Sequence, residues 1–201
     1  MVEAAARHRP RIACILLAAG GSSRLGLPKQ LARRRMRPLI LTALAAAREA
    51  LDGAEVVVVL GAGALRLRAL LRRHEPGARI ALNPHWHAGL AGSLKIGLDA
   101  APLGTAAILV LLVDQPNVGG AALRRLLAAW RRRPSQPAAA YYSGHAGVPA
   151  ILPRRCWRAL RELDGDAGAR MLLRSAATPT LVVIPEAAFD VDTPDDLARL
   201  R

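Results

Sequence analysis

A glycine-rich loop follows the first apolar run of the chain and has the composition of a phosphate-binding site. It reads LAAGGSSRLGLPKQL over residues 17–31, and its glycines are Gly20, Gly21 and Gly26. Glycine permits positive φ angles and a close approach of a ligand to the backbone, and successive amide N–H groups in such a loop attract anions. Arg24 and Lys29 add positive charge. This combination suits a nucleoside triphosphate.

The loop differs from the two commoner phosphate-binding loops. A Walker A loop needs Lys and Ser or Thr directly after its last glycine, whereas Leu27 and Pro28 follow Gly26. A dinucleotide-binding GxGxxG pattern also fails, because the glycines fall at 20, 21 and 26. The later segment GAGALR, residues 61–66, has Arg66 in place of the third Gly or Ala. We interpret it as an ordinary turn between a strand and a helix, and a Rossmann dehydrogenase is disfavoured.

A carboxylate at the end of a buried strand is the second chemical signal. The segment LLVDQP, residues 111–116, ends an apolar run with Asp114 and a turn that contains proline. A carboxylate at the carboxyl end of a strand, facing a phosphate loop, is well placed to hold Mg²⁺ against phosphate oxygens. An aspartate in such a place can also be a turn residue or a helix N-cap. The glycine-rich loop favours the metal site.

A second pair of carboxylates lies near the C-terminus, in FDVDTPDDL, residues 189–197. On an extended segment Asp190 and Asp192 share a face but stand roughly 7 Å apart, so we expect only one of them to share an ion with Asp114. A short helix is predicted to begin at Thr193–Pro194. Acidic residues in the first turn of a helix complement its dipole, which sufficiently explains Asp195 and Asp196.

Short apolar runs alternate with segments of helical period, which predicts βα units around a parallel sheet. The predicted strands are Ile12–Leu17, Glu55–Leu60, Arg79–Leu82, Ala106–Val113, Ala138–Tyr142 and Leu181–Ile184. The predicted helices are Pro38–Ala50, Ala64–His74, Ser93–Ala100, Gly119–Trp130, Arg154–Leu163 and the short one from Pro194. Strands so uniformly apolar are typical of a sheet buried on both faces. We expect a single domain over residues 1–201, with residues 1–10 as a flexible N-terminal segment.

Composition excludes several classes of protein. The net charge is +14, yet all basic residues except Lys29 and Lys95 are Arg, spread through the whole chain, so the charge by itself decides nothing about function. Aromatic residues make up 3% and none interleaves with the runs 33–37 and 131–133, which disfavours single-stranded nucleic acid as a ligand. No apolar run approaches the roughly 18 residues of a membrane span. Neither a disulfide nor a zinc site is indicated by Cys14 and Cys156, and we expect a cytoplasmic protein.

The loop resembles the signature LAAGxSxRxGxxKxL of the nucleotidyltransferases that include the molybdenum cofactor cytidylyl- and guanylyltransferases. Every fixed position is matched, by Leu17, Ala18, Ala19, Gly20, Ser22, Arg24, Gly26, Lys29 and Leu31. In that family LAAG accompanies cytidine and LAGG guanosine nucleotides, and Ala19 follows the cytidine pattern. The DQP of residues 114–116 and the DTPxDL of residues 192–197 are similar to the segments that carry its metal ligands, which implies Asp114 and Asp192 as ligands of Mg²⁺.

The resemblance extends to segments beside the substrates. NPHWHAGLAGSLKIGL, residues 83–98, is similar to the segment that holds the base, which implies a contact through Ser93; a plain N-cap is the alternative role of this serine. His85 and His87 are a poor pair of metal ligands, because no third ligand follows. GHAGVPAILP (144–153) and LDGDAGARMLL (163–173) are similar to the acceptor side. The residues implied to bind the acceptor are Gly147, Pro149, Asp166 and Arg170.

The resemblance implies a Rossmann-like nucleotidyltransferase fold, with helices on both faces of a mostly parallel sheet, and a Mg²⁺-dependent reaction. CMP from CTP would pass to a phosphate-bearing acceptor, molybdenum cofactor, with release of pyrophosphate. Lys29, Arg24 and Asp114 would be catalytic. The loop residues that would bind the nucleotide are Leu17, Ala18, Ala19, Gly20, Gly21, Ser22 and Gly26. A molybdoenzyme or its chaperone is a further partner that the resemblance admits.

Three alternatives remain open at this stage. The same chemistry could act on a sugar, alditol or lactyl phosphate, because the loop sees only the triphosphate. A non-catalytic nucleotide-binding maturation factor would keep the loop without needing both carboxylates, and a basic nucleic-acid-binding domain is the third alternative. The chain departs from the family after Leu31, where ARRRMRPLI replaces the usual short turn with glycine.

Overall fold

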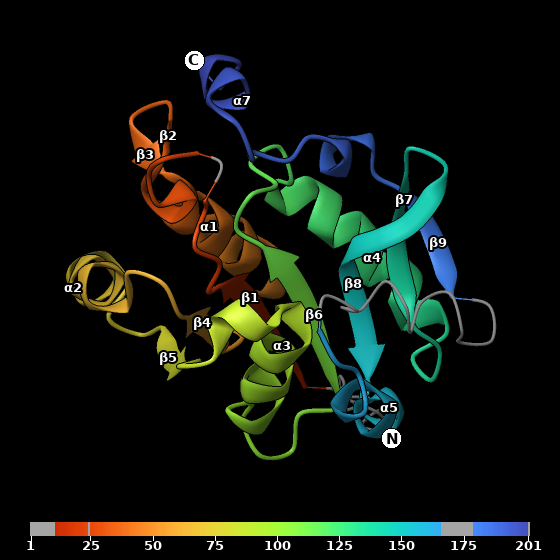
Figure 1. The fold of residues 1–201 in the computed structure, drawn as a ribbon. Helices are drawn as coiled ribbons and strands as arrows, with labels where there is room; N and C mark the ends of the chain where they lie inside the picture. Colours follow the sequence, from red (N-terminus) through yellow and green to blue (C-terminus); the bar gives the residue numbers. More distant parts are fainter. Residues whose placement is uncertain (1–10, 24, 166–178, 201) are drawn as a thin grey trace, which may run out of the picture.

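A seven-stranded sheet forms the centre of the computed structural model, which describes residues 11–23, 25–165 and 179–200 (Figure 1). In spatial order its strands are β5 (Arg79–Leu82), β4 (Val56–Leu60), β1 (Ile12–Ala18), β6 (Ala107–Leu112), β8 (His145–Pro153), β7 (Ala138–Tyr142) and β9 (Thr180–Val183). The first four run parallel, as do β7 and β9, whereas β8 is antiparallel to both of its neighbours. The predicted mostly parallel α/β sheet is confirmed. The expected flexible segment 1–10 lies outside the described residues.

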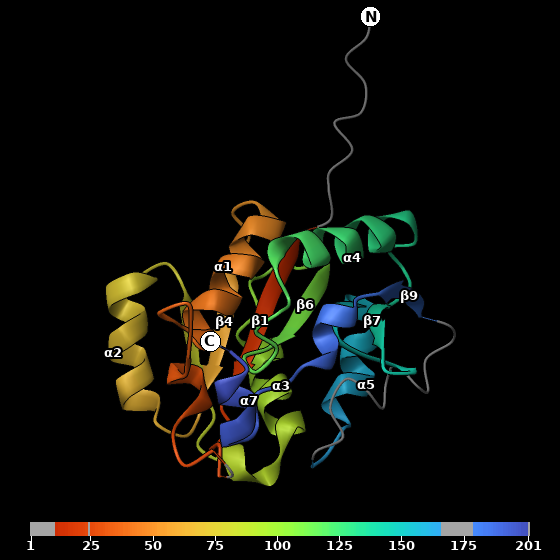
Figure 2. The same ribbon diagram turned by 90° about the horizontal axis from the view of Figure 1, so that it is seen from above.

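Helices cover both faces of the sheet, as Figure 2 shows from above. The cause is visible in β1, whose fully buried side chains alternate between two apolar clusters, with Leu16 in one and Ile15 in the other. Burial of each such side chain stabilises the fold by about 1.5–3 kcal/mol. One face is covered by α1 (Leu39–Leu51), α2 (Ala64–His74) and α4 (Gly120–Arg132), and the other by α3 (Leu90–Asp99) and α5 (Trp157–Arg161).

Strand β8 is the main element that the sequence analysis does not predict. Proline is rare inside sheets because it has no N–H to donate, and this segment contains Pro149 and ends at Pro153. The pairing of β7 with β8 shifts register between Ala139, which faces Ala150, and Ala140, which faces Gly147. The irregularity leaves Pro149 between the paired positions, so its missing N–H interrupts no pairing in the ladder.

The departure after Leu31 forms a small hairpin of β2 (Arg33–Arg34) and β3 (Arg37–Pro38). Both tip residues, Arg35 and Met36, have positive φ angles of 46° and 65°, and Met36 is 77% exposed. Two consecutive left-handed residues are the geometry of a tight hairpin turn, which glycine usually supplies. The hairpin therefore keeps a turn where the family has one, but presents large side chains at its tip.

Helix ends differ from the predictions by up to one turn. Helix α3 begins at Leu90 after Gly89, so the prediction of a helix start at Ser93 is wrong, and so is the N-cap alternative for Ser93. The predicted helix 154–163 is a 3₁₀ turn over Arg154–Cys156 followed by α5. Other short 3₁₀ segments are η1 (Lys29–Leu31), η2 (Trp86–Ala88) and η4 (Pro185–Ala188). The predicted helix at Pro194 is α7 (Pro194–Ala198).

Both cysteines, Cys14 and Cys156, are buried and free. Burial raises the pKa of each thiol above its ordinary value, so both stay protonated at neutral pH. Among the described residues, no helix has the length and apolar character that crossing a membrane requires.

Candidate active site

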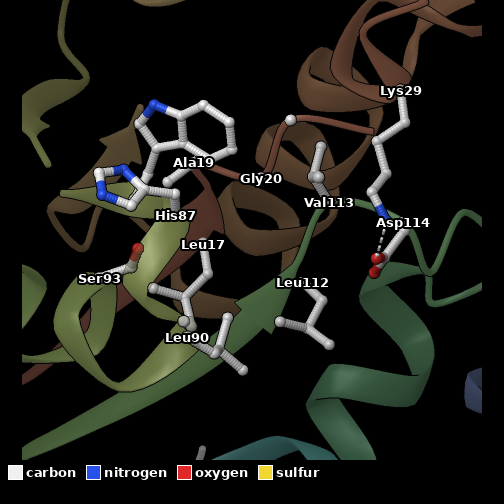
Figure 3. A pocket seen from close by; sticks show the side chains of 13 residues that line it. Leu17, Ala19, Gly20, Lys29, His87, Leu90, Ser93, Leu112, Val113 and Asp114 are labelled. Carbon is white, nitrogen blue, oxygen red and sulfur yellow. Dashed lines mark hydrogen bonds and ion pairs between the residues drawn. The ribbon is translucent and has the colours of Figure 1, made fainter. Parts of the chain in front are cut away.

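The carboxyl ends of β1 and β6 open into a cavity of about 280 Å³. Loops that follow neighbouring parallel strands meet at the same edge of a sheet, which is where α/β proteins bind ligands. Figure 3 shows the glycine-rich loop at Ala19 and Gly20 beside this cavity. His87 and Ser93 lie at one end of the cavity, and Lys29 and Asp114 at the other.

A second cavity, also of about 280 Å³, adjoins the first. Gly20 and Lys29 line both, and the second adds Ser22, Ser23 and Asp192. Lys29 therefore stands between two cavities, the first lined mostly by apolar residues and glycine and the second with a larger share of polar residues. A nucleotide has the same division, with a flat base at one end and a charged phosphate chain at the other.

Lys29 joins the two carboxylates that the sequence analysis predicts as metal ligands. Its Nζ donates to Oδ2 of Asp114 at 2.6 Å and to Oδ1 of Asp192 at 2.7 Å. The side chains of Lys29 and Asp114 are only 14% and 17% exposed. Burial alone would lower the pKa of Lys29, but the negative charge of Asp114 and the hydrogen bonds to both carboxylates outweigh it and raise the pKa. Lys29 is therefore a permanent cation at this point.

The donor set has capacity for a further cation. Oδ1 of Asp114 is buried and has no hydrogen-bond partner among the described residues. An unpaired buried carboxylate oxygen is costly, and a hard divalent cation takes oxygen ligands of this kind. No group of three or more His, Cys, Asp or Glu side chains able to hold a metal occurs in the part of the chain that the structure describes. An ion here would have to complete its shell with water or phosphate oxygens, which is the usual habit of Mg²⁺.

The charges of Asp114 and Asp192 act on the carboxyl group of Asp190. Burial raises its pKa to about 6, and the negative charges of Asp114 and Asp192 act in the same direction, against a hydrogen bond from Gln115 and the charge of Lys29. Its carboxyl group thus ionises less readily than an ordinary aspartate, and Lys29 bonds to the other two carboxylates instead.

The segment that carries Asp192 is held in place by a capping box. Oδ2 of Asp196 accepts from the backbone N–H groups of Asp192 and Thr193 and from the Thr193 hydroxyl, while the same hydroxyl accepts from the N–H of Asp196. Asp196 therefore does more than complement the dipole of α7: it fixes the backbone of Asp192. The S/T-x-x-E/Q-like spacing of Thr193 and Asp196 was the signal for this role in the sequence.

The glycine-rich loop is shaped by side chains as well as by its glycines. Gly26 has a φ of +72°, and Ser22 is also left-handed, with a φ of 55°. The Ser22 hydroxyl accepts from the N–H of Lys29 at 3.0 Å. Gln30, which is buried, donates to the carbonyl groups of Ala18 and Gly20 at 2.9 and 2.8 Å. Sequence reasoning missed Gln30, whose position beside Lys29 was the available signal.

Trp86 supports the loop from the side of the base segment. A Cβ atom at Gly21 would lie 2.7 Å from the indole ring of Trp86, and one at Gly61 would lie 2.5 Å from the Cβ of Trp86. Only glycine fits at these two positions while the indole stays where it is. The ring thus connects the loop after β1 with the turn after β4, a contact that the sequence analysis did not predict.

Ser93 is hydrogen-bonded to Asn83, next to the first cavity. The hydroxyl of Ser93 accepts from Nδ2 of Asn83 at 2.9 Å, and Oδ1 of Asn83 accepts from the N–H of His85. Ser93 is buried and also lines the first cavity. The structure therefore gives it a definite local task, to hold the turn that leads to Trp86 and His87. Its direct contact with a base stays a prediction.

Of the residues predicted to bind the acceptor, the two that the structure describes line neither cavity. These two, Gly147 and Pro149, are buried in β8. A Cβ at Gly147 would lie 2.5 Å from the hydroxyl oxygen of Tyr142, so packing already accounts for this glycine. Arg24, Asp166 and Arg170 lie outside the described residues. Binding of an acceptor by Gly147, Pro149, Asp166 and Arg170 stays a prediction, and so does the catalytic role of Arg24.

Comparison with known proteins agrees with this geometry. The family described as MobA-like NTP transferase domain matches residues 14–180. The chain belongs to this family. It is also 36% identical, over 95% of its length and 97% of the relative's, to nicotine blue oxidoreductase of Paenarthrobacter nicotinovorans. The resemblance drawn from the sequence is thus confirmed for the MobA-like family.

Two solved structures from Mycobacterium tuberculosis H37Rv are similar to this MobA-like chain. Rv0371c superposes with a TM-score of 0.82 at 31% identity, covering 95% of this chain and 97% of the other. A complex of Rv0371c with manganese gives a TM-score of 0.77 at 29% identity, covering 94% and 97%. Family membership supports a nucleotidyltransferase that uses a nucleoside triphosphate and a phosphorylated acceptor.

Proposed function

We propose that this protein is a Mg²⁺-dependent cytidylyltransferase that passes CMP from CTP to a phosphate-bearing acceptor, molybdenum cofactor, and releases pyrophosphate. The observation that carries the proposal is the contact of Lys29 with both Asp114 and Asp192 beside the glycine-rich loop. Packing of the core does not require one cation and two carboxylates beside the cavity at the glycine-rich loop. They are the groups that phosphoryl chemistry requires.

Asp114 and Asp192 would hold the Mg²⁺ ion. The buried Oδ1 of Asp114 supports this assignment, because it has no hydrogen-bond partner among the described residues and its lone pairs can coordinate a metal ion. The ion would supply charge neutralisation on the phosphate oxygens of the nucleotide. Mn²⁺ accepts the same oxygen ligands, so the donor set by itself does not separate the two metals.

The chain's own residues align the nucleotide and neutralise its charge. Lys29, Arg24 and the amide groups of the loop would stabilise negative charge on the triphosphate, and Gln30 and Ser22 keep the loop in shape for it. The attacking phosphate of the acceptor is already largely ionised at neutral pH, so the reaction needs no general base. Rate enhancement then comes from alignment of the two substrates.

Ala19 is the basis for the choice of CTP. It follows the cytidine pattern LAAG, it lines the first cavity, and it lies beside Gly20 where the loop turns away from β1. Molybdenum cofactor as the acceptor rests on the resemblance to the molybdenum cofactor nucleotidyltransferases. Sugar, alditol and lactyl phosphates remain alternative acceptors for the same chemistry.

One relative favours a second candidate, because its name describes an oxidoreductase and it matches nearly the whole chain. Hydride transfer commonly uses a nicotinamide cofactor. A paired set of carboxylates bridged by a lysine is not needed for that chemistry, and the GxGxxG pattern is missing from the loop. We therefore rank nucleotidyl transfer first.

A paired assay tests the two candidates on one preparation. Pyrophosphate release is measured from each of the four NTPs with Mg²⁺, with and without molybdenum cofactor, and oxidation of NADH and NADPH by an added quinone-type dye as electron acceptor is followed separately. We expect release from CTP that depends on both metal and acceptor. Release from GTP alone would mean that the nucleotide is GTP and not CTP. Oxidation of the nicotinamide without any pyrophosphate release would mean that the protein is an oxidoreductase and not a nucleotidyltransferase.

A further inference from the structure

The arginines of this protein fall into two classes in the structure. Most of the described ones have a hydrogen bond or an ion pair, as Arg34 has with the Pro116 carbonyl and Arg48 with Glu75. The arginines whose guanidinium group has no hydrogen bond or ion pair with any described residue are Arg33, Arg35, Arg66, Arg68, Arg72, Arg73, Arg131, Arg132 and Arg133. They occur only on the β2–β3 hairpin, on α2 and at the end of α4. A uniform bias in composition would scatter them instead.

The hairpin and α2 lie side by side (Figure 1) and form the walls of one groove with a volume of about 430 Å³. Arg33 comes from the hairpin, and Arg66, Arg73 and His74 come from α2. The remaining lining residues are apolar and are together called the floor of the groove below; they are Leu31, Pro38, Ala69 and Leu70. No carboxylate is among these lining residues, and the groove shares none of them with the two cavities of the candidate active site.

Like charges on facing walls repel one another, and this repulsion is relieved when an anion enters between them. Glu75, the acidic residue that follows α2, is already paired with Arg48 and lies 3.9 Å from the guanidinium of Arg37. It therefore leaves the groove without a counter-charge of its own. Guanidinium groups bind carboxylates through two parallel hydrogen bonds, so carboxylates suit these walls.

The groove is physically connected to the catalytic loops. Leu31 on its floor ends the 3₁₀ turn that begins with Lys29. Arg34, next to Arg33, donates from Nη1 to the carbonyl of Pro116 at 2.7 Å, two residues after Asp114. A molecule bound in the groove would lie beside the nucleotide site without occupying it.

We propose that this groove docks an acidic segment of a partner protein, with its carboxylates on Arg33, Arg66 and Arg73 and an apolar side chain on the floor. The apolar floor favours a peptide over an inorganic anion, which would gain nothing from Leu31 and Leu70. A nucleic acid is the less suitable occupant, because no Phe, Tyr or Trp side chain lines the groove for bases to stack on. The chemistry of the partner is thus acidic and amphipathic.

The test uses two variants with the same change of charge. One is the groove variant Arg33→Glu/Arg66→Glu/Arg73→Glu, and the matched control is Arg131→Glu/Arg132→Glu/Arg133→Glu, which reverses the three unpaired arginines at the end of α4. The probes are a fluorescein-labelled peptide of Glu-Glu-Leu repeats, its Gln-Gln-Leu counterpart and single-stranded DNA. Fluorescence anisotropy at physiological ionic strength gives each dissociation constant, and melting temperatures check that both variants fold; Arg66→Glu alone replaces the groove variant if it does not.

We expect the acidic peptide to bind the wild type, and its dissociation constant to rise at least about tenfold in the groove variant, or 1.4 kcal/mol, but to stay near the wild-type value in the control. The neutral peptide should bind much more weakly than the acidic one. Equal weakening in both variants would mean attraction to net charge, and the proposal would be wrong. It would also be overturned by an acidic peptide that fails to bind, or by DNA that binds more tightly and loses its affinity in the groove variant.

Discussion

The backbone N–H of Val191 donates a hydrogen bond of 2.9 Å to the carbonyl oxygen of Asp114. This bond attaches the segment before α7 to the end of β6 and places Asp192, the next residue, beside the carboxylate of Asp114. Lys29, from a third segment, then contacts both side chains. Since the three groups depend on one another for their positions, their contributions to activity are not expected to add.

Removal of either predicted metal ligand is the first test of the mechanism. If Asp114 and Asp192 jointly hold Mg²⁺, Asp114→Asn and Asp192→Asn should each lose most of the activity. The double variant should be hardly worse than the poorer single one, because residues that act as a unit are non-additive. The measurement is pyrophosphate release against Mg²⁺ concentration. Normal activity of Asp114→Asn would rule out the two-carboxylate mechanism.

Asp190→Asn is the internal control for that experiment. Lys29 forms no bond with Asp190 although it bonds both other carboxylates, and the raised pKa of Asp190, about 6, reflects its weaker stabilisation as an anion. We expect this variant to retain substantial activity over the same range of Mg²⁺. If it is inactive while Asp192→Asn works normally, the ligand has been assigned to the wrong residue of the pair.

Lys29→Ala should keep its fold and lose turnover by about 10²–10³, which is the usual effect of removing one charge-stabilising donor. Lys95→Ala is the matched control, because Lys95 is the only other lysine and its salt bridge with Asp164 lies on an exposed carboxylate. Pyrophosphate release and the melting temperature are measured for both. If Lys29→Ala has wild-type turnover, Lys29 does not stabilise the triphosphate and the phosphate site must lie elsewhere.

Sequence reasoning was most successful where chemistry follows a strand. Asp114 and the glycine-rich loop both come directly after buried apolar runs, and parallel topology forces such positions to one edge. The contact between them is therefore a consequence of the fold class. That Lys29 would also reach Asp192 was not predicted, because this bond depends on the Val191–Asp114 attachment, which no local pattern announces.

The contacts that were missed join segments far apart in the chain. Trp86 packs on Gly21 and Gly61, and Asn83 holds Ser93. In the sequence each of these residues has an ordinary local explanation, such as a turn or a cap. Strand β8 was missed for a different reason: Pro149 opposes strand pairing locally, and only the shifted register opposite it makes the strand possible.

CTP with Mg²⁺ should raise the melting temperature more than GTP with Mg²⁺ does. Ala19 follows the cytidine pattern, and a ligand that binds only the native state stabilises it in proportion to the logarithm of its concentration over its dissociation constant. Thermal denaturation at matched nucleotide concentrations measures the difference, with CTP lacking Mg²⁺ as the control. A larger shift with GTP would reverse the base assignment.

Gly21→Ala should destabilise the protein even without nucleotide, because its new Cβ would lie 2.7 Å from the Trp86 ring. Overpacking of this kind costs about 1–3 kcal/mol, and each kcal/mol lowers the Tm by about 2–4 °C in a chain of this size. Gly20→Ala is the matched control, since a Cβ there meets nothing within 4 Å, and its Tm should stay near the wild type. Trp86→Leu removes the ring, so adding Gly21→Ala to it should cost much less than in the wild type. If Gly21→Ala costs the same in both backgrounds, its effect does not come from Trp86, and the support of the loop by this indole would have to be abandoned.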